Sequence, residues 1–202
     1  QIITELKLSH SDEKEKARRL FYYVRDQIHY SVYMIATKLE DFVASTVLQR
    51  GKGYCVQKAV LLAALARAAG IPSRLVFAKI RNHKAPRELA EQTGYDYFPS
   101  HGYTQLFLGE QWVNLTPAFD KELCEKTNVP VVEFDGIHDA SLPQYDLSGK
   151  PYISYLEKYE PQADLPFEWL RGKILPIWGE KPAWLTLEDS KGHVMPSGYV
   201  FR

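Results

Sequence analysis

Cysteine is scarce in this chain, which has two cysteines in 202 residues. So few cysteines cannot form the disulfide framework of a small secreted scaffold, and zinc-binding spacings such as C-x₂-C are missing. A phosphate-binding G-x-x-x-x-G-K-[ST] loop is also missing. We therefore expect no metal and no cofactor, and a reducing, cytoplasmic location. A targeting segment could still precede Gln1, because the first methionine is Met34.

Long apolar runs and net charge are lacking too. The longest apolar run, residues 59–66, is far too short to span a bilayer. Basic and acidic residues both number 25, so the formal net charge is zero, and no basic block alternates with aromatic residues. We expect neither a membrane nor a nucleic acid as partner. The length fits one domain, residues 1–202, with a core of about 12–120 and a C-terminal extension of 121–202.

Helical patterns come first along the chain. Residues 12–28 predict an amphipathic helix that Ser11 can cap, and residues 41–50 predict a short helix that Gly51 would end. Residues 55–69 are apolar almost all round, which predicts a helix in the centre of the domain. The apolar positions of the first helix recur at helical spacing and are predicted to pack into the core; they are Ala17, Leu20, Phe21, Val24 and Ile28.

Strand patterns follow the helices, at residues 74–80, 102–108 and 111–115. Gly109 and Glu110 fit a two-residue hairpin turn between the last two strands. Weaker patterns predict a loop at residues 84–100 and helical turns at 120–127 and 165–171. This order indicates an α+β fold, in which N-terminal helices and a central buried helix pack on an antiparallel sheet.

The segment with the most chemical content precedes the buried helix and reads Gly-Lys-Gly-Tyr-Cys over residues 51–55. Its glycines allow close backbone approach, and Cys55 stands at the N-terminus of the helix. Free N–H groups and the helix dipole there favour an anion, which would lower the thiol pKa and could hold an oxyanion. A buried structural cysteine is the alternative for Cys55. It is the expected role of Cys124, which has no glycine loop or helix start before it.

A cysteine nucleophile needs a nearby imidazole, and a third group that orients the imidazole. Of the six histidines, His101 opens a predicted strand whose hairpin partner carries Asn114, Thr116 and, just beyond, Asp120. Such a hairpin would place both base and orienting group against the start of the central helix. Cys55 and His101 are therefore the candidate nucleophile and base.

Several motifs occur in order around these two residues. They are Ala-Ser-Thr-Val-Leu at 44–48, Gly-Lys-Gly-Tyr-Cys at 51–55, Arg-Ala-Ala-Gly-Ile-Pro-Ser-Arg at 67–74, His-Gly-Tyr at 101–103 and Gln-Trp-Val-Asn-Leu-Thr-Pro at 111–117. Together they resemble the transglutaminase-like superfamily over about residues 15–120. The tail at 133–136 looks like that of bacterial members often named cysteine proteases.

The resemblance implies a papain-like fold with a Cys-His-Asp triad, in which Cys55 and His101 match the nucleophile and the base. The family usually has Asp just before the proline of the last motif, and this chain has Thr116 there. We predict Asp120 as the third member, with Asn114 and Thr116 as alternatives. The superfamily often takes an oxyanion donor from an earlier segment, for which the candidates are Tyr23, Gln27 and Tyr30.

The predicted function is acyl transfer through a Cys55 thioester, on an amide or peptide bond of a protein or peptide substrate. Hydrolysis by a protease, amidase or deamidase is expected rather than cross-linking, because transamidation needs exclusion of water and the sequence has no sign of it. The alternative is a non-catalytic transglutaminase-like module for binding or scaffolding, which Thr116 favours.

Overall fold

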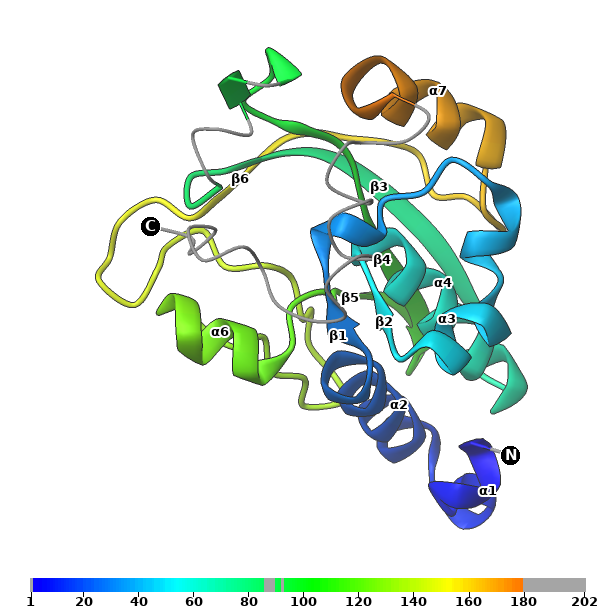
Figure 1. Cartoon of the computed structure of the whole chain (residues 1–202). Coiled ribbons are helices and arrows are strands. Elements are labelled where there is room, and N and C mark those ends of the chain that lie inside the picture. Colours follow the sequence, from blue (N-terminus) through cyan, green and yellow to red (C-terminus); the bar gives the residue numbers. More distant parts are fainter. Residues whose placement is uncertain (1, 86–89, 92, 180–202) are drawn as a thin grey trace.

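The computed structural model describes residues 2–85, 90–91 and 93–179, and these form an α+β fold as predicted (Figure 1). Its helices are α1 (Ile2–Glu5), α2 (Glu13–Gln27), α3 (Ala44–Arg50), α4 (Cys55–Ala68), α6 (Lys121–Thr127) and α7 (Phe167–Trp178), with 3₁₀ turns η1 (Leu8–His10), η2 (Val32–Met34) and η3 (Leu39–Phe42). Its strands are β1 (His29–Tyr30), β2 (Lys52–Gly53), β3 (Ser73–Asn82), β4 (Phe98–Leu108), β5 (Gln111–Leu115) and β6 (Ile153–Lys158).

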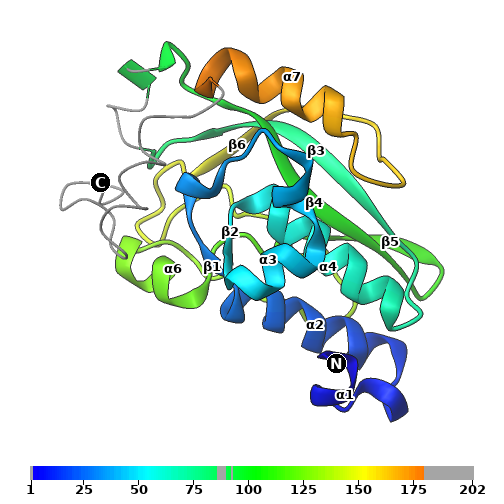
Figure 2. The same cartoon turned by 45° about the vertical axis from the view of Figure 1, so that its right-hand side comes forward.

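Helix α4 is the predicted central helix. Its residues are apolar on nearly every side, and it contacts α2, α3 and strands β3 and β4. Figure 2 shows α2, α3 and α4 together on one face of the sheet. Burial on all sides stabilises such a helix by removing its apolar surface from water. The first residue of this buried helix is Cys55, so the core itself determines where the thiol lies.

Helix α2 confirms the first predicted helix and corrects its cap. All five predicted core positions are buried. The cap is Asp12, whose Oδ1 accepts a hydrogen bond from the N–H of Glu15 at 2.8 Å. Ser11 instead ends η1, one residue too early to reach the free N–H groups of α2.

A four-stranded antiparallel sheet in the order β5-β4-β3-β6 carries the second half of the site. Strands β4 and β5 form the predicted hairpin, whose Gly109 and Glu110 both have positive φ, as a two-residue turn of this kind requires. Strand β4 begins earlier than predicted, at Phe98, so His101 lies inside the strand rather than at its start. Strand β6 was not predicted; it comes from the extension and pairs with β3.

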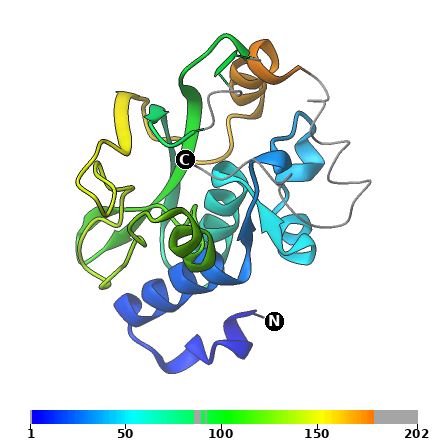
Figure 3. The ribbon, with the colours of Figure 1, turned by 60° about the vertical axis from the view of Figure 1, so that its left-hand side comes forward.

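A second, two-stranded sheet ties the helices to the segment before Cys55. Strand β1 follows α2 and pairs in parallel with β2, with Tyr30 opposite Gly53. Helix α6 lies beside α2 (Figure 3), and α6 and α7 appear where helical turns were predicted, although α7 is longer. Residues 86–89 and 92 of the predicted loop, and 180–202 of the extension, lie outside the described residues. No described helix is both long enough and apolar enough to cross a membrane.

Candidate active site

Cys55 is held at the start of α4 by a local hydrogen-bond network. The side chain of Gln57, on the first turn, accepts from the N–H of Tyr54 at 3.1 Å and donates to the carbonyl of Asp41 at 2.9 Å. Gly51 ends α3 with a φ of +68°, a conformation that residues with a Cβ rarely adopt. The chain therefore turns sharply from α3 into β2 and then into α4, which leaves the thiol at the helix N-terminus.

Strand β4 passes the N-terminus of α4 at Gly102. A Cβ on Gly102 would lie 2.9 Å from Cγ2 and 3.0 Å from Cα of Val56, which is closer than real Cβ atoms come. The absence of a side chain therefore allows the strand to approach the helix directly. This contact places the N–H of Gly102, and the neighbouring His101, beside the start of α4.

The thiol of Cys55 is partly buried, and burial dominates its chemistry. Burial raises the pKa of Cys55 to about 11, while the backbone N–H groups of Gly102, Val56 and Cys55 itself act to lower it. The sequence-based expectation of a lowered pKa is therefore wrong in its direction. The helix N-terminus does favour the thiolate, but the loss of water around it has the larger effect.

His101 is buried, with 3% of its surface exposed. Its ring stacks on that of Tyr103 (centroids 6.1 Å apart, 25° between planes) and meets the ring of Tyr155 edge to face (6.3 Å, 71°). Burial lowers the pKa of His101 to about 4, and no charged group among the described residues offsets this effect. At neutral pH the imidazole is therefore uncharged and able to accept a proton.

This pKa predicts a loss of stability in acid. Because the folded protein holds the pKa of His101 near 4, below its ordinary value of 6.5, the unfolded chain takes up the proton first as the pH falls. The stabilisation is present above about pH 6.5 and is lost towards pH 4, by about 3 kcal/mol in all. Urea unfolding of the wild type and His101→Gln at several pH values measures this. The difference between the two proteins should change by about 2–3 kcal/mol from pH 7 to 4.5, and parallel curves would contradict the burial of His101.

Asp120 makes two contacts to the backbone. Its Oδ1 accepts from the N–H of Leu123 at 3.0 Å and caps α6, and its Oδ2 accepts from the N–H of Tyr30 at 2.8 Å. The carboxylate thus joins α6 to β1, the strand that leads to Tyr30. His101 is not among the contacts described for Asp120, and the orienting role of Asp120 stays a prediction.

Lys58 is a site residue that the sequence analysis did not single out. Its side chain is fully buried, and Nζ donates to the backbone carbonyls of Arg25, at 3.0 Å, and Ile28, at the end of α2. Burial lowers the pKa of Lys58 to about 7, while Asp120 and Asp26 act in the opposite direction. A single lysine in an otherwise apolar helix was the available signal. It fixes α4 to the end of α2, just before β1.

The two alternatives to Asp120 lie in different surroundings. The amide of Asn114 donates to Asp139 at 2.6 Å and accepts from Gln105 at 2.8 Å, so its side chain is already fully engaged. Thr116 is 1% exposed, and its N–H donates to the carbonyl of Ala140 at 2.8 Å. The Thr116 hydroxyl faces the buried rings around His101, where Tyr155 is its neighbour.

The candidate oxyanion donors separate clearly. Tyr30 is close enough to Cys55 that the thiol, after burial, helps to raise its pKa, whereas Tyr23 lies near Glu5 and Gln27 is exposed. The backbone N–H groups near the thiol supply further donors. Cys124 is buried in the core and, like Cys55, is a free cysteine, so the pair forms no disulfide.

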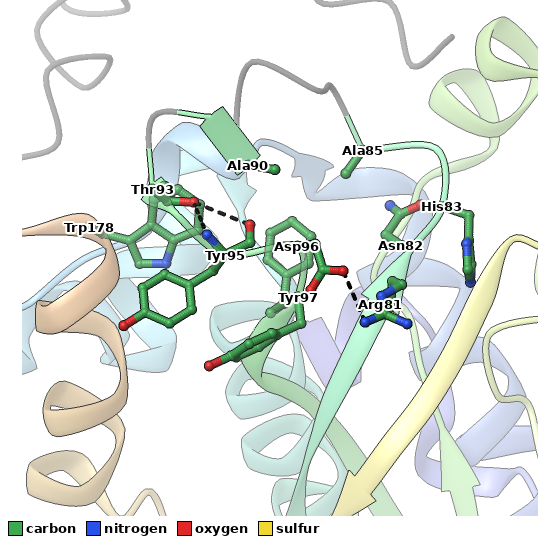
Figure 4. A pocket seen from close by; sticks show the side chains of 11 residues that line it. Arg81, Asn82, His83, Ala85, Ala90, Thr93, Tyr95, Asp96, Tyr97 and Trp178 are labelled. Atoms are coloured by element: carbon green, nitrogen blue, oxygen red, sulfur yellow. Dashed lines mark hydrogen bonds and ion pairs between the residues drawn. The ribbon is translucent and has the colours of Figure 1, made fainter.

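A cavity of about 200 Å³ lies where β4 begins, three residues before His101 (Figure 4). The ion pair between Arg81 and Asp96, 2.9 Å long, is on one side of it. Aromatic rings form much of the rest, namely those of Tyr95, Tyr97, Phe98 and Trp178. Trp178 and Phe98 stack on each other, and Trp178 belongs to the same apolar cluster as Tyr54, so the cavity and Cys55 share a wall. In the described part of the chain, no three His, Cys, Asp or Glu residues are grouped as metal ligands.

Residues 1–117, more than half of the chain, match the family model of the Transglutaminase-like superfamily. The chain belongs to this superfamily. This membership confirms the resemblance found in the motifs, and it supports cysteine-based catalysis in general. No curated protein is similar enough to this chain to count as a match.

Among solved structures, three similarities are weaker. They are with a proposed protease from Parabacteroides distasonis (17% identity, TM-score 0.40, covering 57% of this chain and 22% of that one), a TGase (18%, 0.40, 57% and 29%) and a proposed cysteine protease from Cytophaga hutchinsonii (14%, 0.42, 79% and 47%). The chain spans less than half the length of each of these proteins.

Proposed function

We propose that this protein transfers acyl groups through a thioester on Cys55, with His101 as the base. The observation that carries the proposal is the convergence on one thiol of a buried helix N-terminus and the N–H of Gly102, the residue next to His101. A nucleophile, a base and oxyanion donors are the three groups that acyl transfer requires. Family membership supports the same chemistry.

The first half-reaction starts from a neutral pair, because the pKa of Cys55 is about 11 and that of His101 is about 4. As Sγ bonds to the carbonyl carbon of an amide, the thiol proton moves to His101. The carbonyl oxygen becomes an oxyanion, which the backbone N–H groups of Gly102 and Cys55 stabilise. His101 then gives the proton to the departing amine as the C–N bond breaks, and the thioester remains.

The second half-reaction returns the enzyme to its starting state. His101 takes a proton from the acceptor, the acceptor attacks the thioester carbon, and the proton passes to Sγ as the C–S bond breaks. Water as acceptor gives hydrolysis, and a primary amine gives transamidation. We infer hydrolysis of protein or peptide amides, because transamidation requires water to be kept out of the site. The aromatic cavity beside β4 suits an apolar side chain of such a substrate.

Product analysis distinguishes the two acceptors. With a glutamine-containing peptide, ammonia release should continue at nearly the same rate when a labelled primary amine is added. Little label should enter the peptide, since water competes at about 55 M and nothing described here excludes it. The matched control is Cys55→Ala, which should release no ammonia. Label incorporation faster than hydrolysis would show a transamidase instead.

A non-catalytic binding module is the second candidate. The neutral resting state of Cys55 and His101, and Thr116 in the place of a carboxylate, favour it, because both weaken the drive to form thiolate and imidazolium. A binding module has no need for a Cys55 that reacts faster than an ordinary thiol at neutral pH. The alkylation measurement that closes the Discussion separates the two candidates.

A further inference from the structure

Three buried polar atoms near Cys55 have no hydrogen-bond partner of ordinary geometry. They are His101 Nε2, Thr116 Oγ1 and Tyr155 Oη. Buried polar groups are nearly always paired, because an unpaired one loses its water without compensation. Three such atoms in one neighbourhood therefore point to a shared function rather than to packing alone.

The Tyr155 hydroxyl comes from β6, on the far side of β3 from His101. The residue of β3 opposite His101 is Ala78, whose small side chain leaves room above the central strand. Across this gap the ring of Tyr155 meets the imidazole edge to face, with centroids 6.3 Å apart. The unpredicted strand thus brings a hydroxyl to the buried side of the base.

The Thr116 hydroxyl comes from the end of β5. The register that pairs Leu115 with Thr104 continues to place Thr116 opposite Tyr103, whose ring stacks on that of His101. Burial raises the pKa of Tyr155 to about 12, whereas the backbone at Leu142 and the Thr116 hydroxyl act to lower it. Thr116 and Tyr155 are therefore close to each other as well as to the imidazole, although their hydroxyls do not form an ordinary hydrogen bond.

We propose that the hydroxyls of Thr116 and Tyr155 together orient His101, as positioning residues that replace a carboxylate by two uncharged acceptors. The proposal rests on the proposed function of Cys55 and His101. Nε2–H of the neutral imidazole donates to one hydroxyl oxygen, and that hydroxyl donates to the other. The second ring nitrogen, Nδ1, then carries no proton and can accept the one from Cys55.

A hydroxyl pair differs from a carboxylate because it fixes the tautomer without stabilising a positive charge. The groups that face the imidazole are Cys55 from α4, Tyr103 from β4, Thr116 and Tyr155, and all are uncharged at neutral pH. This accounts for a pKa of His101 near 4 in a base that still has neighbours able to orient it. The imidazolium then forms only during the reaction.

The test measures the His101 tautomer by two-bond ¹⁵N–¹H correlations in the full chain, alongside kcat/KM on a glutamine-containing peptide. Tyr155→Phe and Thr116→Val should each reduce the Nε2–H form and lower kcat/KM about 2- to 10-fold. Thr116→Ser keeps the hydroxyl and should preserve both. The control is Tyr145→Phe, a tyrosine that is 58% exposed, which should change neither.

A gain-of-charge variant tests the same arrangement from the other direction. Thr116→Asp places a carboxylate where the hydroxyl stands, so the pKa of His101 should rise by about 1–3 units. Alkylation of Cys55 at neutral pH should become faster, because the thiolate–imidazolium pair becomes accessible. Thr116→Asn, which has the same shape without the charge, should not raise the pKa of His101.

The outcomes separate this proposal from the proposed function. Unchanged tautomers in both Tyr155→Phe and Thr116→Val overturn it, as does a tautomer that changes in Asp120→Asn but in neither of these variants. If the tautomer responds as expected while the wild type shows no turnover that depends on Cys55, the orienting pair stands and the proposed function fails.

Discussion

Replacement of Cys55 by alanine is expected to abolish turnover, with a loss in kcat of about 10³-fold or more. The thioester cannot form without Sγ, and His101 has no comparable nucleophile to activate. The variant should still fold, because Cys55 is only partly buried and starts a helix whose other residues form the core. Ammonia release from a glutamine-containing peptide measures the activity, and urea unfolding measures the stability.

Cys124→Ala is the matched control for this loss. Cys124 is 1% exposed within the main apolar cluster and has no part in the proposed reaction. Its replacement should cost about 1 kcal/mol of stability, through lost packing, while turnover stays close to that of the wild type. Equal activity in Cys55→Ala and the wild type would show that Cys55 is not the nucleophile, and comparable losses in both cysteine variants would point to folding instead.

Replacement of Gly102 by alanine is expected to reduce both stability and activity. The added Cβ would lie 2.9 Å from Val56 Cγ2 and 3.0 Å from its Cα, and the second contact is with backbone that cannot rotate away. The strand must therefore move off the N-terminus of α4, at a cost of about 1–3 kcal/mol. The same movement takes His101 and the Gly102 N–H away from Cys55, so kcat should fall by about 10- to 100-fold.

Gly172→Ala provides the comparison for this prediction. Gly172 lies exposed in α7, with no atom within 4 Å of its added Cβ and no positive φ. Alanine there should raise stability by about 0.5–1 kcal/mol, because it favours the helix, and leave activity unchanged. A Gly102→Ala variant as stable and active as Gly172→Ala would contradict the close contact between β4 and α4.

The parts of the fold that were predictable follow from local patterns. Helix α4 was predicted because it is apolar on every side, and α2 because its apolar residues recur on one face. The hairpin at Gly109 was predicted from a turn that only a few residues can form. Cys55 and His101 could be singled out because both stand in motifs with a specific spacing, while the superfamily match supplies independent support.

The missing parts depend on contacts between distant segments. Strand β6 was not predicted, since Ile153–Lys158 is partly exposed and becomes a strand only by pairing with β3. The raised pKa of Cys55 was missed for a similar reason: the helix N-terminus can be seen in the sequence, whereas the burial that outweighs it cannot. Tyr155 carries no local signal at all, because its position next to His101 is created by the sheet order.

The central claim is that His101 removes the proton from Cys55, and the rate of Cys55 alkylation by iodoacetamide as a function of pH tests it most directly. In the wild type, His101 assists the reaction wherever it is neutral, so labelling should be measurable at neutral pH and fall only towards the His101 pKa of about 4. In His101→Ala, labelling should require the thiolate and rise only towards the Cys55 pKa of about 11. Coincident profiles for the two proteins, rising together at high pH, would contradict the claim and favour the binding module.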